Sequence, residues 1–181
     1  MTLRGTIHLE DIMNLEGIPA VRCGKVVRKP LYKVRIVHSG TGLDVYPDAE
    51  LMALLHAGYD SIQVFCEGID RNHIGYCDFN DIITRAARLG IQTFFHNYIR
   101  TYIHPDEDGA QEKFDAAYGE LFRRYPGLGG IGLCGESLEF PSRDPATTGK
   151  PYNKSVIDGI PDTRPSPGWY PCEDYPAYVQ C

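Results

Sequence analysis

From residue 33 onward, the chain repeats a pattern of a short apolar run, a polar loop, an amphipathic stretch and a glycine. A short apolar run is typical of a buried strand, and apolar residues three and four apart are typical of a helix. Strands that alternate with helices form a parallel sheet with right-handed connections, so the pattern predicts an α/β fold. The predicted strands are 34–38, 61–65, 92–96 and 130–134, and the predicted helices are 48–56, 80–89 and 110–125.

Capping residues and apolar stripes define the predicted helices. Asp78 precedes the second helix, where its side chain can accept a hydrogen bond from the first turn. Gly90 follows the same helix, at a position where a left-handed conformation closes the last turn. The third helix is expected to bury the stripe of Phe114, Ala117, Tyr118, Leu121 and Phe122.

Four such units form either an open doubly wound sheet or half of a barrel. A (β/α)8 barrel takes about 250 residues, and each unit here takes roughly 30 to 40, which favours the barrel. We therefore expect residues 31–181 to form the first half of a TIM (β/α)8 barrel, truncated before or within the fourth helix. Residues 1–30 do not follow the repeat and predict the tail of an upstream α+β domain with a linker, its helix at 7–15.

Composition and charge exclude several classes of protein. The net charge is -6 and the 18 Lys and Arg residues are scattered, which argues against a nucleic-acid partner. The sequence has no apolar run of the roughly 20 residues that span a bilayer, so no membrane partner is expected. The six cysteines are irregularly spaced, which predicts free thiols in a reducing, cytoplasmic location. No metal site, cofactor motif or nucleophile elbow is present, and we expect neither metal nor cofactor.

In a parallel barrel, the carboxyl ends of the strands and the loops after them form the active-site face. The candidates for substrate binding at these positions are His38, Glu67, His96, Asn97 and Glu139, and Tyr98 follows the same strand as His96. Only one of His96 and Asn97 can point inward, because side chains alternate along a strand. Trp169 lies in the long fourth loop, where its ring either stacks on a sugar or anchors the loop.

Glu136 is the strongest catalytic candidate. It follows Leu133-Cys134-Gly135 at the rim of an apolar strand, where partial desolvation can adapt a carboxyl group to general acid catalysis. The alternative is a structural role, in which the carboxylate caps the loop or pairs with Arg143. For Glu67 and Glu139, a structural or solvent-facing role is the main alternative.

Two segments resemble glycoside hydrolases of the β-hexosaminidase and α-glucuronidase type, including an uncharacterised bacterial group. They are Arg4-Gly-Thr-Ile-His with Lys29-Pro30 and Tyr46-Pro-Asp, which resemble the junction between the small α+β domain and the barrel, and Gly130 to Arg143, with Gly-Glu-Ser-Leu-Glu-Phe-Pro-Ser-Arg-Asp-Pro, which resembles the bacterial group. The resemblance implies a barrel after a small α+β domain, with a general acid Glu at the end of the fourth strand, where Glu136 stands. The β-hexosaminidases have Asp directly before that Glu, whereas this chain has Gly135, which argues against substrate-assisted cleavage of an N-acetylhexosamine.

The resulting expectation is a glycoside hydrolase that acts on a carbohydrate substrate. Glu136 would protonate the leaving oxygen, and the partner carboxylate would lie beyond residue 181. The 181 residues alone are then expected to be inactive, and the open edges of the half-barrel to favour self-association. The alternatives are a non-catalytic carbohydrate-binding barrel and a barrel lyase or isomerase that uses Glu136 as a base.

Overall fold

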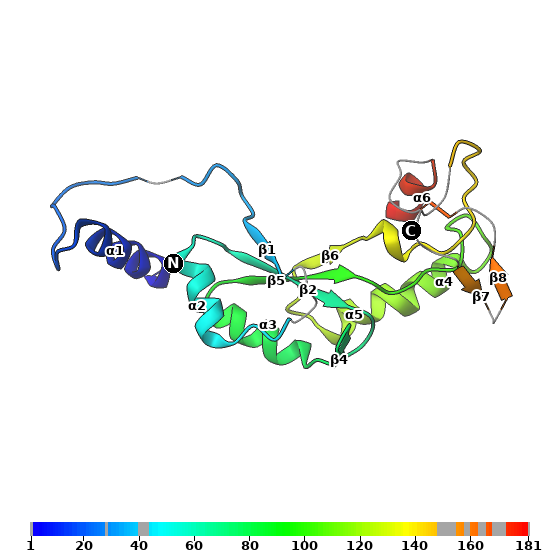
Figure 1. Ribbon diagram of the computed structural model, residues 1–181, viewed down its shortest axis with the longest axis horizontal. Helices are drawn as coiled ribbons and strands as arrows, with labels where there is room; N and C mark the ends of the chain where they lie inside the picture. Colours follow the sequence, from blue (N-terminus) through cyan, green and yellow to red (C-terminus); the bar gives the residue numbers. More distant parts are fainter. Residues whose placement is uncertain are drawn as a thin grey trace.

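The computed structural model describes residues 2–27, 29–39, 44–147, 155–157, 160–162, 166–167 and 173–180. The molecule is elongated, with a parallel sheet in its middle (Figure 1). Helix α1 (Thr2–Glu16) lies at one end, and the short helix α6 (Asp174–Gln180) lies at the other. Among the described residues, no helix has the length and apolar character that crossing a membrane requires.

The sheet confirms the α/β class predicted from the repeat. Its four strands are β1 (Ile36–His38), β2 (Ser61–Cys66), β5 (Gln92–Asn97) and β6 (Gly130–Gly132). They are parallel and adjacent in chain order, β1-β2-β5-β6, without a reversal. Strands β1 and β6 are two residues shorter than predicted, and β2 and β5 are one residue longer.

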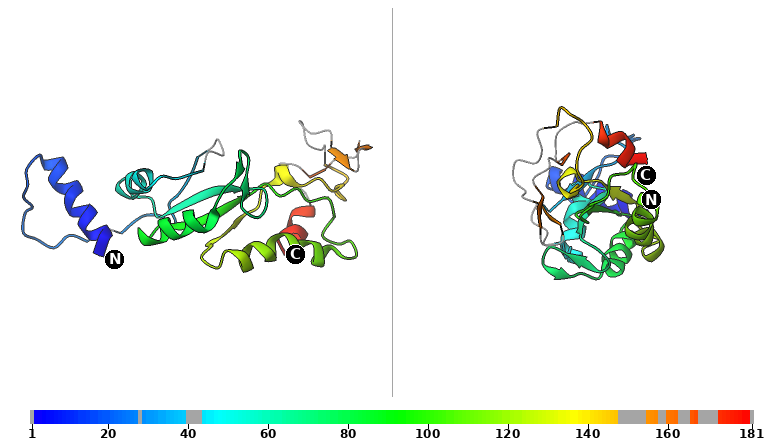
Figure 2. Two further views of the ribbon diagram at one scale, coloured as in Figure 1. Left: turned by 90° about the horizontal axis from the view of Figure 1, so that it is seen from below. Right: turned by 90° about the vertical axis from the view of Figure 1, so that its right-hand side faces the viewer.

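The main core lies between one face of the sheet and the helices. Helices α2 (Asp48–His56), α3 (Phe79–Arg88) and α5 (Glu120–Arg124) contribute Leu51, Phe79 and Leu121 to one cluster with strand residues. These helices cover the same face of the sheet, as Figures 1 and 2 show together. Right-handed connections between strands in sequential order place every connecting helix on that side. On the other face of the sheet Phe65 is 5% exposed, whereas His38, Gln63 and His96 are half-buried, so that face is only partly covered.

The predicted caps of the second helix are present. The Asp78 carboxylate accepts a hydrogen bond from the backbone N–H of Asp81 at 3.0 Å. Gly90 has a φ of 71°, and Gly58, after α2, has a φ of 88°. Both glycines occupy the left-handed region in which a side chain is disfavoured, so each fits the end of its helix.

The third predicted helix differs from a regular α-helix. It consists of α4 (Ala110–Phe114), a π-helical turn η1 (Asp115–Gly119) and α5. A π-helical turn adds a residue to the turn and shifts the phase of the following side chains. Phe122, predicted to be buried, is 47% exposed, whereas Tyr125 is fully buried. The prediction for Phe122 was wrong because it assumed an uninterrupted period of 3.6 residues.

A small hairpin follows β2 and was not predicted. It pairs β3 (Arg71–Asn72) with β4 (Gly75–Tyr76) in antiparallel register. Its turn is closed by the Asn72 side-chain oxygen, which accepts a hydrogen bond from Ile74 N–H at 3.1 Å. His73 therefore lies in the turn of this hairpin. A second hairpin, β7 (Ser155–Ile157) with β8 (Ile160–Asp162), lies in the fourth loop.

Helix α1 packs against α2. It is longer than the predicted 7–15, and its Ile7 is 5% exposed and belongs to the main core. His56 on α2 lies 3.1 Å from the Asp11 carboxylate on α1. The helix ends at Gly17, which has a φ of 68°. Part of the segment predicted as an upstream tail therefore contacts the α/β unit directly.

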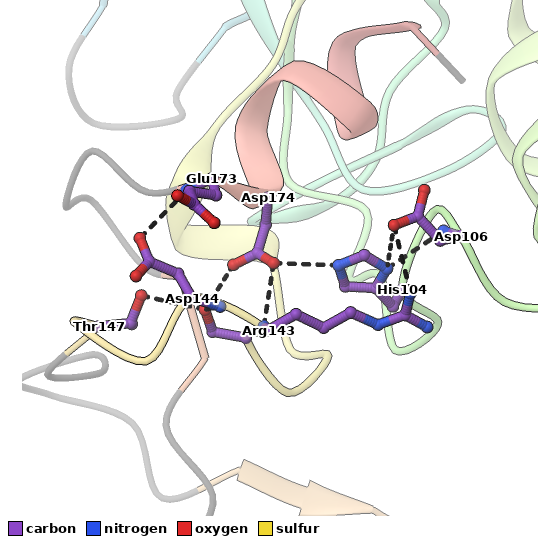
Figure 3. Close-up of polar contacts among 8 residues, drawn as sticks. His104, Asp106, Arg143, Asp144, Thr147, Glu173 and Asp174 are labelled. Atoms are coloured by element: carbon purple, nitrogen blue, oxygen red, sulfur yellow. Dashed lines mark hydrogen bonds and ion pairs between the residues drawn. The ribbon is translucent and has the colours of Figure 1, made fainter.

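Helix α6 is held by a buried polar cluster beyond the carboxyl ends of the strands (Figure 3). Asp174 is 2% exposed, and its carboxylate accepts hydrogen bonds from His104 Nε2 at 3.0 Å and Ser142 Oγ at 2.5 Å. The backbone N–H of Arg143 donates to the same carboxylate at 3.0 Å. These contacts tie the loop after β5 and the loop after β6 to α6.

Candidate active site

Aromatic and imidazole rings line the partly covered face at the carboxyl ends of three strands. Phe65 on β2 lies opposite His96 on β5 in the strand register, and their ring centroids are 5.0 Å apart. His38, the last residue of β1, lies 4.5 Å from the Phe65 ring and 4.9 Å from the His96 ring. Tyr98 extends the set, with its ring 5.1 Å from His96. Three strands thus contribute to one continuous row of rings.

A buried carboxylate supports the row from the first loop. Asp44 is 1% exposed, and its Oδ2 accepts a hydrogen bond from the backbone N–H of Phe65 at 2.6 Å. Strand β1 pairs with β2 only as far as His38, which lies opposite Gln63. Beyond that point the Asp44 carboxylate, and not a backbone carbonyl of β1, accepts the hydrogen bond from β2. Asp44 therefore fixes the backbone that carries the central ring.

Glu136 lies at the end of the row. Its carboxylate accepts a hydrogen bond from the Tyr98 hydroxyl at 2.6 Å, and the residue is half-buried. It sits in the 3-10 turn η2 (Gly135–Ser137), which is fixed by the Ser137 hydroxyl donating to the Cys134 carbonyl at 2.7 Å. Burial and the bond to Glu136 raise the pKa of the Tyr98 phenol, so the phenol stays protonated and donates at neutral pH. The predicted structural partner, Arg143, pairs with Asp106 at 3.2 Å.

Glu67 lies beside the same row and is paired with His73. Its Oε1 makes a short hydrogen bond with Nδ1 of His73, and its Oε2 lies 3.8 Å from Nε of Arg71. The His73 ring contacts Phe65 at 4.5 Å and Tyr98 at 4.7 Å between centroids. The hairpin after β2 thus adds a carboxylate and an imidazole to the site.

The electrostatic setting of His96 differs from that of a solvated histidine. Burial lowers its pKa, and the neighbouring His38 and His73 lower it further, while Glu136 opposes the shift. Like charges disfavour each other's ionisation, so the neighbouring imidazoles disfavour a positive charge on His96. His96 is therefore neutral at neutral pH and can accept or donate a hydrogen bond through its ring nitrogens.

Asn97 points to the opposite face of the sheet. It is fully buried, and its amide donates to the Tyr118 hydroxyl at 3.1 Å and the Tyr178 hydroxyl at 3.5 Å. Its side-chain oxygen accepts a hydrogen bond from Ile99 N–H at 2.8 Å. Asn97 therefore joins β5 to the helical η1 turn and α6, and lies apart from the row that contains His96.

Glu139 is buried beyond the row, at 1% exposure. Its carboxylate pairs with the exposed Arg100 guanidinium at 3.5 Å, and its backbone N–H donates to the Thr101 carbonyl at 2.7 Å. Trp169 lies outside the described residues. In the described part of the chain, no three His, Cys, Asp or Glu side chains are grouped so that they could hold a metal ion.

The sequence pattern placed Tyr98 at the active-site face but assigned it no role, and it did not indicate His73 at all. Tyr98 follows His96 by two residues, so the alternation that turns His96 toward the open face was a signal for Tyr98 as well. For His73 no comparable signal existed, because its position depends on the unpredicted hairpin. The set brought together is thus His38, Glu67, His73, His96, Tyr98 and Glu136.

This arrangement combines two chemical capacities. The half-buried rings of Tyr98 and His96 provide a flat apolar surface, which suits the apolar face of a sugar, and their polar edges can bind hydroxyl groups. The carboxylates of Glu136 and Glu67, with the imidazole of His73, can transfer protons. Comparison with protein-family models, curated proteins and solved structures gives no match for the chain.

Proposed function

We propose that this chain is the first half of a (β/α)8 barrel glycoside hydrolase. Two features of the fold support a barrel over an open doubly wound sheet. The strand order does not reverse, and the helices of the main core cover one face only. Doubly wound sheets reverse their strand order at a switch point and carry helices on both faces. The partly covered face is then the inner face of the barrel, and the row of rings lies at its active-site end.

Glu136 is the general acid in this proposal. The observation that carries the assignment is its position after the fourth strand, half-buried and oriented by the Tyr98 hydroxyl at 2.6 Å. In glycoside hydrolysis, a carboxylic acid protonates the glycosidic oxygen while the bond to the anomeric carbon breaks. A fixed orientation keeps the proton in line with that oxygen. Sequence reasoning expects the partner carboxylate beyond residue 181.

The row of rings holds the sugar. The half-buried Tyr98 supplies stacking surface, with the buried Phe65 ring packed against it, and the half-buried His96 ring offers its nitrogens to hydroxyl groups. Glu67 is then an oriented carboxylate at the rim. Asn97 and Glu139 serve the packing of the loops and are left out of the proposed binding set.

The test is Glu136→Gln in the full-length protein, assayed on a panel of 4-nitrophenyl glycosides. Turnover is expected to fall by about 10²- to 10⁴-fold, which is the usual contribution of general acid catalysis. Glu120→Gln is the matched control, because Glu120 is exposed on α5 and pairs with the exposed Arg123 at 3.1 Å. Circular dichroism should show the same fold for both variants. Near-normal turnover of Glu136→Gln would refute the assignment.

A second candidate is a non-catalytic carbohydrate-binding barrel. The continuous row formed by His38, Phe65, His96 and Tyr98 favours it, because stacking on a sugar requires no acid. It predicts that the native protein binds oligosaccharides in isothermal titration but cleaves no glycoside. Tyr98→Ala would then weaken binding, while Glu136→Gln would leave it nearly unchanged.

A further inference from the structure

We infer that His73, oriented by Glu67, is the second proton-transfer residue of the site and acts as the base that activates water. The inference rests on the proposed glycosidase function. It places both proton-transfer groups within the present chain, in contrast to the expectation of a carboxylate beyond residue 181.

The pairing fixes which His73 nitrogen can act. An ionised carboxylate only accepts hydrogen bonds, so the short contact with Glu67 Oε1 places the proton of neutral His73 on Nδ1. Nε2 then carries the lone pair. Among the described residues the His73 ring makes its hydrogen bond through Nδ1, and the side chain is 32% exposed, so Nε2 is within reach of solvent. This nitrogen is thus available to a water molecule or a substrate.

Tyr98 connects this pair to the general acid. The His73 ring meets the Tyr98 ring edge-on, at 80° and 4.7 Å, and the hydroxyl of the same tyrosine donates to Glu136 at 2.6 Å. One phenol therefore separates the two proton-transfer groups. An acid and a base on either side of a bound sugar are the arrangement by which hydrolysis with inversion proceeds.

In the proposed step, water replaces the leaving group at the anomeric carbon. The water oxygen forms a bond to the anomeric carbon and gives one proton to His73 Nε2. The bond from that carbon to the leaving oxygen breaks, and the leaving oxygen takes the proton of Glu136. Glu67 stabilises the imidazolium that results, and the proton returns to Glu136 through solvent after the products leave.

The charged and titratable groups around His73 come from three elements. Glu67 follows β2, Arg71 lies on β3, and Tyr98 and His96 come from the β5 region. Arg71 repels a positive charge on the His73 ring, and Glu67 attracts one. The carboxylate is the closest of these groups, so it decides the orientation of the ring.

The experiment compares His73→Asn, Glu67→Gln and Glu136→Gln in the full-length protein, on 4-nitrophenyl and 2,4-dinitrophenyl glycosides. His73→Asn is expected to lower kcat about 10²- to 10³-fold on both leaving groups and to abolish the acidic limb of the pH profile. Glu67→Gln is expected to lower kcat about 10-fold. Glu136→Gln should be rescued in part by the better leaving group, because that group needs less protonation. Added imidazole should restore part of the activity of His73→Asn.

His56→Asn is the matched control, since His56 also pairs with a carboxylate, that of Asp11, but lies between α1 and α2. It should keep native activity. If His73→Asn stays within threefold of native activity with its acidic limb intact while Glu136→Gln is inactive, the role of His73 is refuted and the glycosidase proposal stands. If Glu136→Gln stays active while His73→Asn is inactive, the role of Glu136 fails instead.

A measurement that needs no substrate tests the pairing itself. Long-range ¹H–¹⁵N correlation spectra report which ring nitrogen carries the proton in neutral histidine. We expect the Nδ1–H form for His73 in the native protein and a shift toward the Nε2–H form in Glu67→Gln. A native His73 in the Nε2–H form would overturn the inference even if no glycoside is ever cleaved.

Discussion

Replacing Asp174 by Ala should release helix α6 from the rest of the molecule. The Asp174 carboxylate accepts three hydrogen bonds, from His104, Ser142 and the backbone of Arg143 (Figure 3). Each contributes about 1 kcal/mol net, and leaving the buried His104 ring N–H without a partner costs about 1 kcal/mol or more. The total cost is about 4 kcal/mol. A helix of seven residues has too little intrinsic stability to persist without these contacts.

Hydrogen exchange of the α6 amides is the assay, because the loss is expected to be local. A cost of about 4 kcal/mol corresponds to almost 10³-fold faster opening, since 1.4 kcal/mol is tenfold in an equilibrium constant. Amides in α3 should keep their protection. Asp106→Ala is the control, because Asp106 is exposed and such pairs contribute about 0–1 kcal/mol. The reasoning is refuted if exchange in α6 changes less than tenfold, or if α3 loses protection equally.

Two further predictions concern titratable groups in the fold. Burial and His38 lower the pKa of His96, so the unfolded chain binds a proton there at higher pH than the folded chain does. The free energy of unfolding should therefore fall as the pH drops below about 6.5. Between pH 7 and pH 5, the Tm of His96→Gln should decrease less than the Tm of the native protein. An equal decrease contradicts this prediction. Burial also raises the pKa of Cys66 to about 12 and that of Cys77 to about 11. At pH 8 a disulfide reagent should modify the exposed Cys23 first and both buried thiols only on unfolding. Mass spectrometry of the modified protein can verify this order. Rapid modification of Cys66 in the folded protein would contradict the prediction.

The sequence was sufficient to predict the α/β class, the four parallel strands and the first two connecting helices. The strands are short apolar runs, and helix α3 also carries capping signals, Asp78 before it and Gly90 after it. The hairpin at Arg71–Tyr76 was missed because its strands are two residues long and show no alternation. The exposure of Phe122 was missed for another reason: a π-helical turn shifts the phase without a sequence signal that we recognised.

The alternation of side chains along a strand predicted the site residues on the strands, but it could not predict those in the loops. His38 and His96 were predicted from their strand-end positions, and they lie in one row of rings. The same alternation places Asn97 against the helices, which the sequence left open as an alternative to His96. His73 was missed because a contact between the loops after β2 and β5 depends on how each loop folds. Loop contacts of this kind have no periodic pattern from which to infer them.

The core and the proposed site are specified by the same alternation along β5. Phe95 is fully buried against the helices, while its neighbour His96 contacts Phe65 on the other face. A shift of one residue in the pairing of β5 would exchange these faces, so that Phe95 faced the open side and His96 entered the core. Burial of Phe95 in the apolar core therefore fixes the register that places His96 beside Phe65. Packing of the core thus also determines which side chains of β5 face the site. Tyr98, two residues after His96, lies on the same side and donates its hydroxyl hydrogen bond to Glu136.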